Sequence, residues 1–210
     1  EPTTALDVTL QGQILFEMKR LVQDSGAALL WITHDLAVVA ELADRIAVMY
    51  AGRIVETGPT AQVLREPRHP YTRGLLDAVP DTVPRGQRLA QIEGLAPRLE
   101  ARPSGCAFHP RCPRASAHCA VDMPQPATEL RQVSRHFARR PALAERLVRA
   151  VTRGQPPGVV RAVDGVSLAL VPGEVLGLVG ESGCGKSTLA RLATGILPPT
   201  AGEVRFEGQP

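Results

Sequence analysis

The chain has 210 residues, of which 44% are apolar, and a formal net charge of +3. This length allows one or two domains with a sizeable core, and no apolar run approaches the roughly 18 residues of a membrane-spanning helix. Charge is unevenly distributed, because residues 98–161 carry 12 Arg against 4 acidic residues, whereas the rest carries 12 Lys and Arg against 17 acidic residues. We therefore expect a basic middle module between two mildly acidic α/β pieces.

The N-terminal piece has the pattern of a helix followed by a buried strand. Apolar side chains recur with a 3.6-residue period over residues 6–25, and Gly26 is a typical left-handed helix end. Residues 27–33 are almost wholly apolar without polar alternation, which predicts a strand covered on both faces and hence a parallel α/β sheet.

His34 directly follows this strand, and open α/β sheets bind ligands at the carboxyl ends of their strands. A lone histidine in such a place is more often structural than catalytic. Asp35 is suited to capping a short helix over 36–42, and residues 45–50 and 53–57, joined by Ala51-Gly52, predict a β-hairpin.

The middle module is rich in arginine but poor in aromatic residues. Only Phe108 and Phe137 occur in it, so the side chains on which bases stack are missing and a nucleic-acid partner is not expected. We expect its arginines to be solvated linker charge near an anionic membrane face.

The C-terminal piece contains the segment Gly180-Glu-Ser-Gly-Cys-Gly-Lys-Ser187, which matches the phosphate-binding pattern G-x-x-x-x-G-K-[ST]. Its glycines allow backbone N–H groups to wrap around phosphates, Lys186 supplies a charge for the β- and γ-phosphates, and Ser187 a hydroxyl for Mg²⁺. Residues 175–179 read as a buried parallel strand before it and residues 187–194 as a helix after it, ended by Gly195. The predicted nucleotide-binding residues are Gly180, Ser182, Gly183, Cys184, Gly185, Lys186, Ser187 and Thr188.

Further segments together resemble the nucleotide-binding domains of ABC transporters. The second half of such a domain is resembled by three segments, Glu1-Pro-Thr-Thr-Ala-Leu-Asp7, Ile32-Thr-His-Asp-Leu36 and 43–58. Residues 159–174, read as paired strands with a Pro-Gly turn, resemble the start of another such domain. The resemblance implies that Glu1 polarises the attacking water, that Asp7 contacts the opposite subunit and that His34 touches the γ-phosphate. These roles suit phosphoryl transfer, which depends on positioning and charge stabilisation.

Residues 67–76 and 105–113 resemble the C-terminal extension of oligopeptide and dipeptide importer ATPases. The resemblance implies an iron–sulfur cluster on Cys106, Cys112 and Cys119, with Arg111 and Arg114 lowering the thiol pKa values and offsetting cluster charge. The spacing does not suit a zinc ribbon.

The sequence departs from this family at the fourth ligand, where Arg135 stands near the expected cysteine. A histidine (His109, His118 or His136) as fourth ligand, a three-ligated cluster and a metal-free loop with free thiols all remain open. Cys184 belongs to the phosphate loop and implies no metal.

The resemblance as a whole implies an α/β fold of P-loop NTPase pieces with a parallel sheet and an irregular cysteine-containing extension. The predicted parts are the end of one nucleotide-binding domain (1–66), the extension (67–137), a linker (138–158) and the start of a second domain (159–210), so we expect a piece of a longer, fused ATPase. The implied function is ATP-driven peptide import, with ATP and Mg²⁺ as cofactors and with transmembrane permease subunits and a paired nucleotide-binding domain as partners, at the cytoplasmic face of the plasma membrane.

Two other classes stay open, a P-loop kinase or GTPase and a metal- or redox-sensing module. On the ABC interpretation the chain alone should hydrolyse ATP poorly, because signature and glutamine-loop motifs are absent from its sequence. The two pieces are complementary halves of one fold, so we also hypothesise a permuted domain in which strand 175–179 covers the edge of strand 27–33 and His34 and Glu1 face the phosphate loop.

Overall fold

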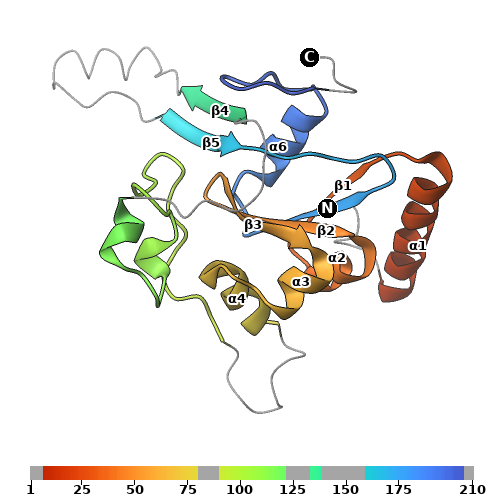
Figure 1. Ribbon diagram of the computed structural model, residues 1–210, viewed down its shortest axis with the longest axis horizontal. Coiled ribbons are helices and arrows are strands. Elements are labelled where there is room, and N and C mark those ends of the chain that lie inside the picture. The colour runs from red at the N-terminus through yellow and green to blue at the C-terminus, as the bar shows by residue number, and fades with distance from the viewer. Residues whose placement is uncertain (1–6, 80–89, 122–132, 139–158, 206–210) are drawn as a thin grey trace.

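The computed structural model describes residues 7–79, 90–121, 133–138 and 159–205, whose elements surround a four-stranded sheet (Figure 1). In chain order the elements are α1 (Val8–Ser25), β1 (Leu29–Thr33), α2 (Leu36–Leu42), β2 (Arg45–Tyr50), β3 (Arg53–Pro59), α3 (Thr60–Arg65), α4 (Pro70–Asp77), the 3₁₀ turns η2 (His109–Arg111) and η3 (Ala117–Ala120), β4 (Val133–Ala138), β5 (Val159–Val166), β6 (Val175–Val179) and α6 (Lys186–Ala193). None of the helices in these ranges is long and apolar enough to cross a lipid bilayer.

Helix α1 begins and ends where the sequence predicts. The Asp7 carboxylate accepts a hydrogen bond from the Leu10 N–H at 2.9 Å and so satisfies one of the free donors of the first turn. Gly26 then adopts a left-handed conformation with φ 66°, and its N–H donates to the Val22 carbonyl. Asp35 caps α2 in the same way as Asp7 caps α1.

The sheet has the order β1-β6-β2-β3, so β6 lies between two strands of the N-terminal piece. Both neighbours run parallel to it, with Thr33 and Val48 each paired to Val179. The pairing of β6 with β1 is the arrangement that the permuted-domain hypothesis expects. Strands β2 and β3 form the predicted antiparallel hairpin around Ala51-Gly52.

Side chains of alternate residues of the central strands pack into two hydrophobic cores, one on each face of the sheet. Val175 and Val179 of β6 pack with buried residues of α1 and α2, whereas Leu176 and Leu178 pack with α6 and β5. Figure 1 shows α2, α3 and α4 on one side of the sheet and α6, β4 and β5 on the other. A strand buried on both faces explains why residues 175–179 show no polar alternation.

Strand β5 pairs differently from the sequence prediction. We expected residues 159–174 to pair with each other through a Pro-Gly turn; instead β5 pairs antiparallel with β4, and residues 167–174 form no strand, although Gly173 does lie in a turn. Strand β4, whose pairing with β5 is interrupted by register shifts around Arg135, was not predicted as a strand from the sequence. Of the predicted linker, residues 139–158 lie outside the described part of the chain.

Asp164 of β5 joins three parts of the chain through charged hydrogen bonds. Its carboxylate accepts from Arg53 of β3 (2.7 Å), from Arg102 of the middle module and from His136 of β4 (3.1 Å). Partial burial alone would raise the pKa of Asp164, but the hydrogen bonds from Arg53, Arg102 and His136 hold that pKa well below its usual range. The arginines expected to be solvated linker charge therefore include at least one internal ion pair, since the Arg102 side chain is only 5% exposed.

Gly177 allows α2 to pack directly against β6. A Cβ atom at this position would lie 2.5 Å from Cγ1 of Val39 and 3.1 Å from Cβ of Ala43. Neither neighbour is a flexible side-chain end, so the absence of a side chain at Gly177 sets the distance between helix and sheet.

We predict that Asp164→Asn lowers the free energy of unfolding by about 2–4 kcal/mol at neutral pH, because Arg53 and Arg102 lose their carboxylate partner. The native carboxyl has a lowered pKa, so its contribution is present above its ordinary pKa of about 4 and is lost as the pH falls below it. Denaturant unfolding between pH 3 and 7 should show a smaller acid dependence in the variant. An identical pH profile in both proteins would contradict the role of Asp164.

A pair of glycine substitutions tests the packing of α2 on β6. Gly177→Ala should destabilise the protein by about 1–3 kcal/mol through overlap with Val39. Gly12→Ala is the matched control, because nothing lies within 4 Å of a Cβ there and Gly12 is inside α1. The control should be neutral or stabilising by up to about 1 kcal/mol. Equal thermal shifts for the two variants would refute the close-packing argument.

Candidate phosphate-binding site

The predicted phosphate loop lies between the end of β6 and the first residue of α6. Gly180 and Gly185 have positive φ angles of 156° and 109°. A Cβ atom at Gly180 would overlap the carbonyl oxygen of Met49, and one at Gly185 that of Ala162. The sequence interpretation ascribed these glycines to contact with phosphate, but here neighbouring strands already require them.

The Lys186 side chain is buried and curls back over its own loop. Its Nζ donates to the carbonyl oxygens of Gly180 (2.7 Å) and Glu181 (2.9 Å) and lies 3.9 Å from Sγ of Cys184. Cys184 packs into the core beside α6, and burial raises the pKa of its thiol. The Lys186 ammonium is therefore bound by carbonyl oxygens of its own loop. An anionic ligand could take the place of these carbonyl oxygens as its partner.

The other predicted binding residues line the open side of the loop. Ser182, Gly183 and Ser187 are exposed, and Thr188 is half-buried. Because Lys186, Ser187 and Thr188 form the first turn of α6, their N–H groups have no partner within the helix. Such a turn presents donors and a partial positive charge to an anion.

The turn of the β2–β3 hairpin is hydrogen-bonded to the phosphate loop through Gly52. The Gly52 N–H donates to the Cys184 carbonyl at 2.8 Å, and the Gly52 carbonyl accepts from the Asp164 N–H at 2.9 Å. One residue of the N-terminal piece thus bridges the phosphate loop and β5 of the C-terminal piece.

His34 is exposed and follows β1 at the edge of the sheet from which the loop emerges. Its predecessor Thr33 pairs with Val179, and Gly180 follows Val179, so His34 and the start of the loop follow neighbouring strands. Glu1 lies outside the described residues, and Asp7 is the cap of α1. The structure thus brings one of the two predicted catalytic residues to the loop.

Sequence reasoning missed three residues that contact each other at the loop: Tyr71, Arg111 and Glu181. The Glu181 N–H donates to the Tyr71 hydroxyl at 3.0 Å, and its carboxylate accepts from Arg111 at 3.3 Å. Tyr71 and Arg111 lie in the two segments that carry the resemblance to the peptide-importer extension. Their place in those segments was the available signal, but nothing in the sequence links them to residue 181.

The three cysteines of the middle module lie in neighbouring turns and border the same hydrophobic core cluster. The Cys106 N–H donates to the Cys119 carbonyl at 2.8 Å, so the turns are in contact. Among the described residues, however, no group of three histidine, cysteine or acidic side chains is arranged to hold a metal ion. An iron–sulfur cluster is therefore not shown for these side chains.

Of the residues considered around the fourth ligand, Arg135 and His136 have partners away from the cysteines. Arg135 and His136 lie on β4, where Arg135 donates to the Pro198 carbonyl at 2.8 Å and His136 bonds Asp164. The Nδ1 atom of His109 donates to the Cys106 carbonyl at 2.9 Å. His118 is in η3.

The expected effect of the arginines on the thiols is wrong. Arg111 turns to Glu181, and burial raises the pKa of Cys106 instead of lowering it. The pKa of Cys119 is lowered, but by hydrogen bonds from Ser116. Arg114 contributes only a backbone N–H to Cys112 Sγ, at 3.4 Å.

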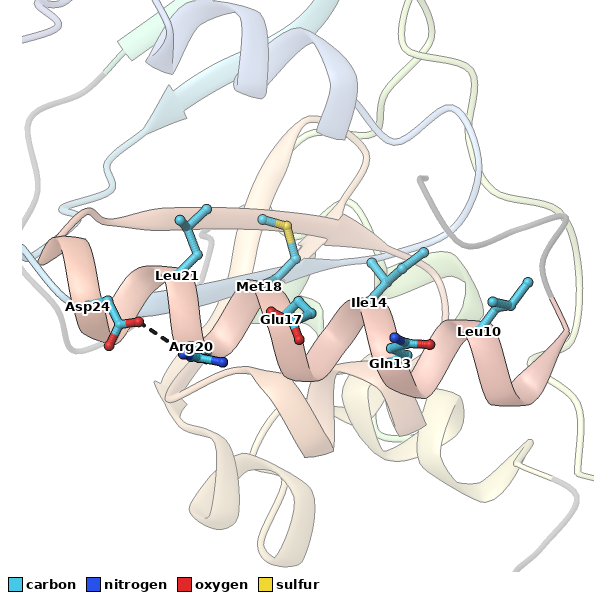
Figure 2. Close-up of a pocket in the computed structure, with 8 residues that line it drawn as sticks. All are labelled: Leu10, Gln13, Ile14, Glu17, Met18, Arg20, Leu21 and Asp24. Carbon is cyan, nitrogen blue, oxygen red and sulfur yellow. Dashed lines mark ion pairs between the residues drawn. The ribbon is translucent and has the colours of Figure 1, made fainter.

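A shallow hollow lies along the outer face of α1, away from the phosphate loop (Figure 2). Its lining residues are Leu10, Gln13, Ile14, Glu17, Met18, Arg20, Leu21 and Asp24. The hollow has neither a glycine-rich turn nor a buried cation, and its one arginine, Arg20, is paired with Asp24 at 3.5 Å. None of the predicted phosphate-binding residues lines this hollow.

Two family models match parts of the chain. Residues 55–119 match the oligopeptide/dipeptide transporter C-terminal region, and residues 163–210 match the ABC transporter domain. Over these ranges the chain is similar to ATP-binding proteins of ABC-type peptide importers. A domain of this class is a P-loop NTPase, which agrees with the α/β fold, and the matches favour neither an unrelated P-loop enzyme nor a redox-sensing module.

Curated relatives of this family align with nearly all of the chain. The oligopeptide transport ATP-binding protein OppD of Mycobacterium tuberculosis is 40% identical over 247 residues, which cover 99% of this chain and 40% of the relative. The glutathione import ATP-binding protein GsiA of Escherichia coli is 42% identical over 212 residues, which cover 100% of this chain and 31% of the relative. The chain therefore spans well under half the length of these relatives.

We predict an order of thiol reactivity from the three environments. At neutral pH Cys119, with its lowered pKa, should react with iodoacetamide before Cys106 and Cys184, whose pKa values burial raises. Peptide mass spectrometry over a labelling time course measures the order. Labelling of Cys106 before Cys119 would contradict these environments.

Proposed function

We propose that this chain contributes ATP-binding and catalytic parts to an ABC-type ATPase that drives import of peptides across a membrane. This proposal rests mainly on one observation: a complete phosphate loop follows β6, and His34 follows β1, which is paired with β6. The two family matches and the names of the relatives support the peptide-import assignment.

The loop residues suit a nucleoside triphosphate with Mg²⁺, which would supply positive charge next to the β- and γ-phosphates. Lys186 would leave the carbonyl oxygens of Gly180 and Glu181 and donate to the β- and γ-phosphates. The first N–H groups of α6 would donate to phosphate oxygens, and the Ser187 hydroxyl would face the metal ion.

His34 and Glu1 carry the proposed steps of hydrolysis. His34 would donate a hydrogen bond to the γ-phosphate from the neighbouring strand, and Glu1 would orient the attacking water. In a longer fused protein Glu1 and His34 would instead belong to the first nucleotide-binding domain and Lys186 to a second, so the shared site beside β1 and β6 is proposed for this chain alone. Asp7 would then lie where the two domains meet.

The proposed partners are permease subunits in the membrane and a paired nucleotide-binding domain, with the protein bound peripherally at the cytoplasmic face of the plasma membrane. The support for the permease partners is the import function in the names of the relatives. The isolated chain should bind nucleotide and hydrolyse it poorly.

Replacement of Lys186 tests nucleotide binding directly. Lys186→Ala should weaken the binding of a fluorescent ATP analogue with Mg²⁺ by roughly 10- to 100-fold, because it removes charge-assisted hydrogen bonds to phosphate. Arg191→Ala is the matched control, since Arg191 is an exposed cation on the same helix. Unchanged affinity in the Lys186 variant would refute the assignment of the loop.

A further inference from the structure

Arg111 joins the middle module to the phosphate loop through several hydrogen bonds. Its side chain is only 8% exposed, and its two terminal nitrogens donate to the Glu181 carboxylate at 3.3–3.4 Å. Further hydrogen bonds reach the Tyr50 hydroxyl (3.1 Å) and the carbonyl oxygens of Ile92 (3.3 Å) and Glu93 (2.9 Å). A planar guanidinium held by this many partners has one fixed orientation.

Tyr71 contacts the same loop residue from α4. Its side chain is fully buried, and its ring packs against those of Tyr50 and Phe108 at centroid distances of 4.6 and 5.4 Å. Burial and the charge of Glu181 raise the pKa of Tyr71, which stays a neutral phenol that accepts the Glu181 N–H. Glu181 is thus held by its main chain through Tyr71 and by its side chain through Arg111.

Glu181 is a problematic residue for a loop that receives an anion. Its carbonyl oxygen bonds the Lys186 ammonium at 2.9 Å, so its carboxylate lies in the same short turn. A carboxylate near bound phosphate repels it, and at 29% side-chain exposure Glu181 is only partly screened by water. The guanidinium of Arg111 supplies the charge that offsets this repulsion.

We propose that Tyr71 and Arg111 are positioning residues of the phosphate loop, so that docking of the peptide-importer extension sets the affinity of the loop for nucleotide. Arg111 neutralises Glu181, and Tyr71 fixes the direction in which the loop leaves β6. The inference rests on the proposed nucleotide binding and adds a regulatory contact to it. A module that moves away from the loop would take Arg111 with it and weaken triphosphate binding.

The electrostatic part is tested with the fluorescent ATP analogue and Mg²⁺. Arg111→Met should weaken binding roughly fivefold to tenfold at low salt. Arg114→Met removes an exposed arginine from the same module and should leave the affinity unchanged. Glu181→Gln combined with Arg111→Met should restore nearly all of the affinity, because no carboxylate is then left to repel phosphate.

Salt dependence separates repulsion from damage to the fold. The affinity ratio between the wild-type protein and Arg111→Met should shrink as salt rises from about 0.05 to about 0.5 M, because screening removes the repulsion. A ratio independent of salt, or a double variant no better than Arg111→Met, would overturn the electrostatic role.

The positioning part is tested without nucleotide by hydrogen–deuterium exchange of the peptide that contains residues 180–188. Tyr71→Phe and Arg111→Met should each raise its exchange several-fold, whereas Arg114→Met should not. Unchanged exchange in both variants would overturn the inference even if the wild-type protein binds nucleotide. Failure of the wild-type protein to bind nucleotide, together with raised exchange, would instead refute the proposed function and leave the loop contact standing.

Discussion

Strand β6 depends on hydrogen bonds to two neighbours, and both neighbours come from the other end of the chain. Leu29 of β1 pairs with Val175, and Arg45 of β2 pairs with Leu176. Side chains of β6 then complete the cores on both faces of the sheet. Without this strand, β1 and β2 would have open inner edges, and the phosphate loop would lack the strands that hold it.

Charge complementarity fastens the basic middle module to the acidic C-terminal piece. Arg102 holds Asp164 and Arg111 holds Glu181, and both arginine side chains are at most 8% exposed. The excess of arginine in the middle of the sequence is therefore used in part inside the molecule. One of these ion pairs fixes β5, and the other fixes the loop that follows β6.

The elements that the sequence predicted well are those whose signals are local. The Asp35 cap, the Gly26 end and the apolar run 175–179 each depend on residues within one turn or strand. The pairing of β6 with β1 followed from the complementarity of two family fragments and not from local pattern, whereas its pairing with β2 was not predicted. Strand β4 and its pairing with β5 were missed, because Val133–Ala138 alternates weakly and its partner lies beyond the linker.

Only the part of the candidate site that depends on a local sequence motif could be predicted. The phosphate loop is a contiguous motif, and its position after a buried strand is confirmed. The contacts of Glu181 with Tyr71 and Arg111 depend on folding across long separations, which no spacing rule contains. The iron–sulfur cluster stays a prediction, because cysteine spacing sets only the distance along the chain and no described group of three donor side chains is arranged to hold a metal ion.

The distant pairing of β6 also affects how the chain is made. When a ribosome has produced β1 and β2, the strand that belongs between them is still more than a hundred residues away. At a synthesis rate of about 5–20 residues per second, the apolar faces of β1 and β2 stay uncovered by β6 for roughly 6–25 seconds. During that time the open edge of β1 can pair with other nascent chains, so the yield of folded protein should depend on translation speed and on chaperones that cover this edge.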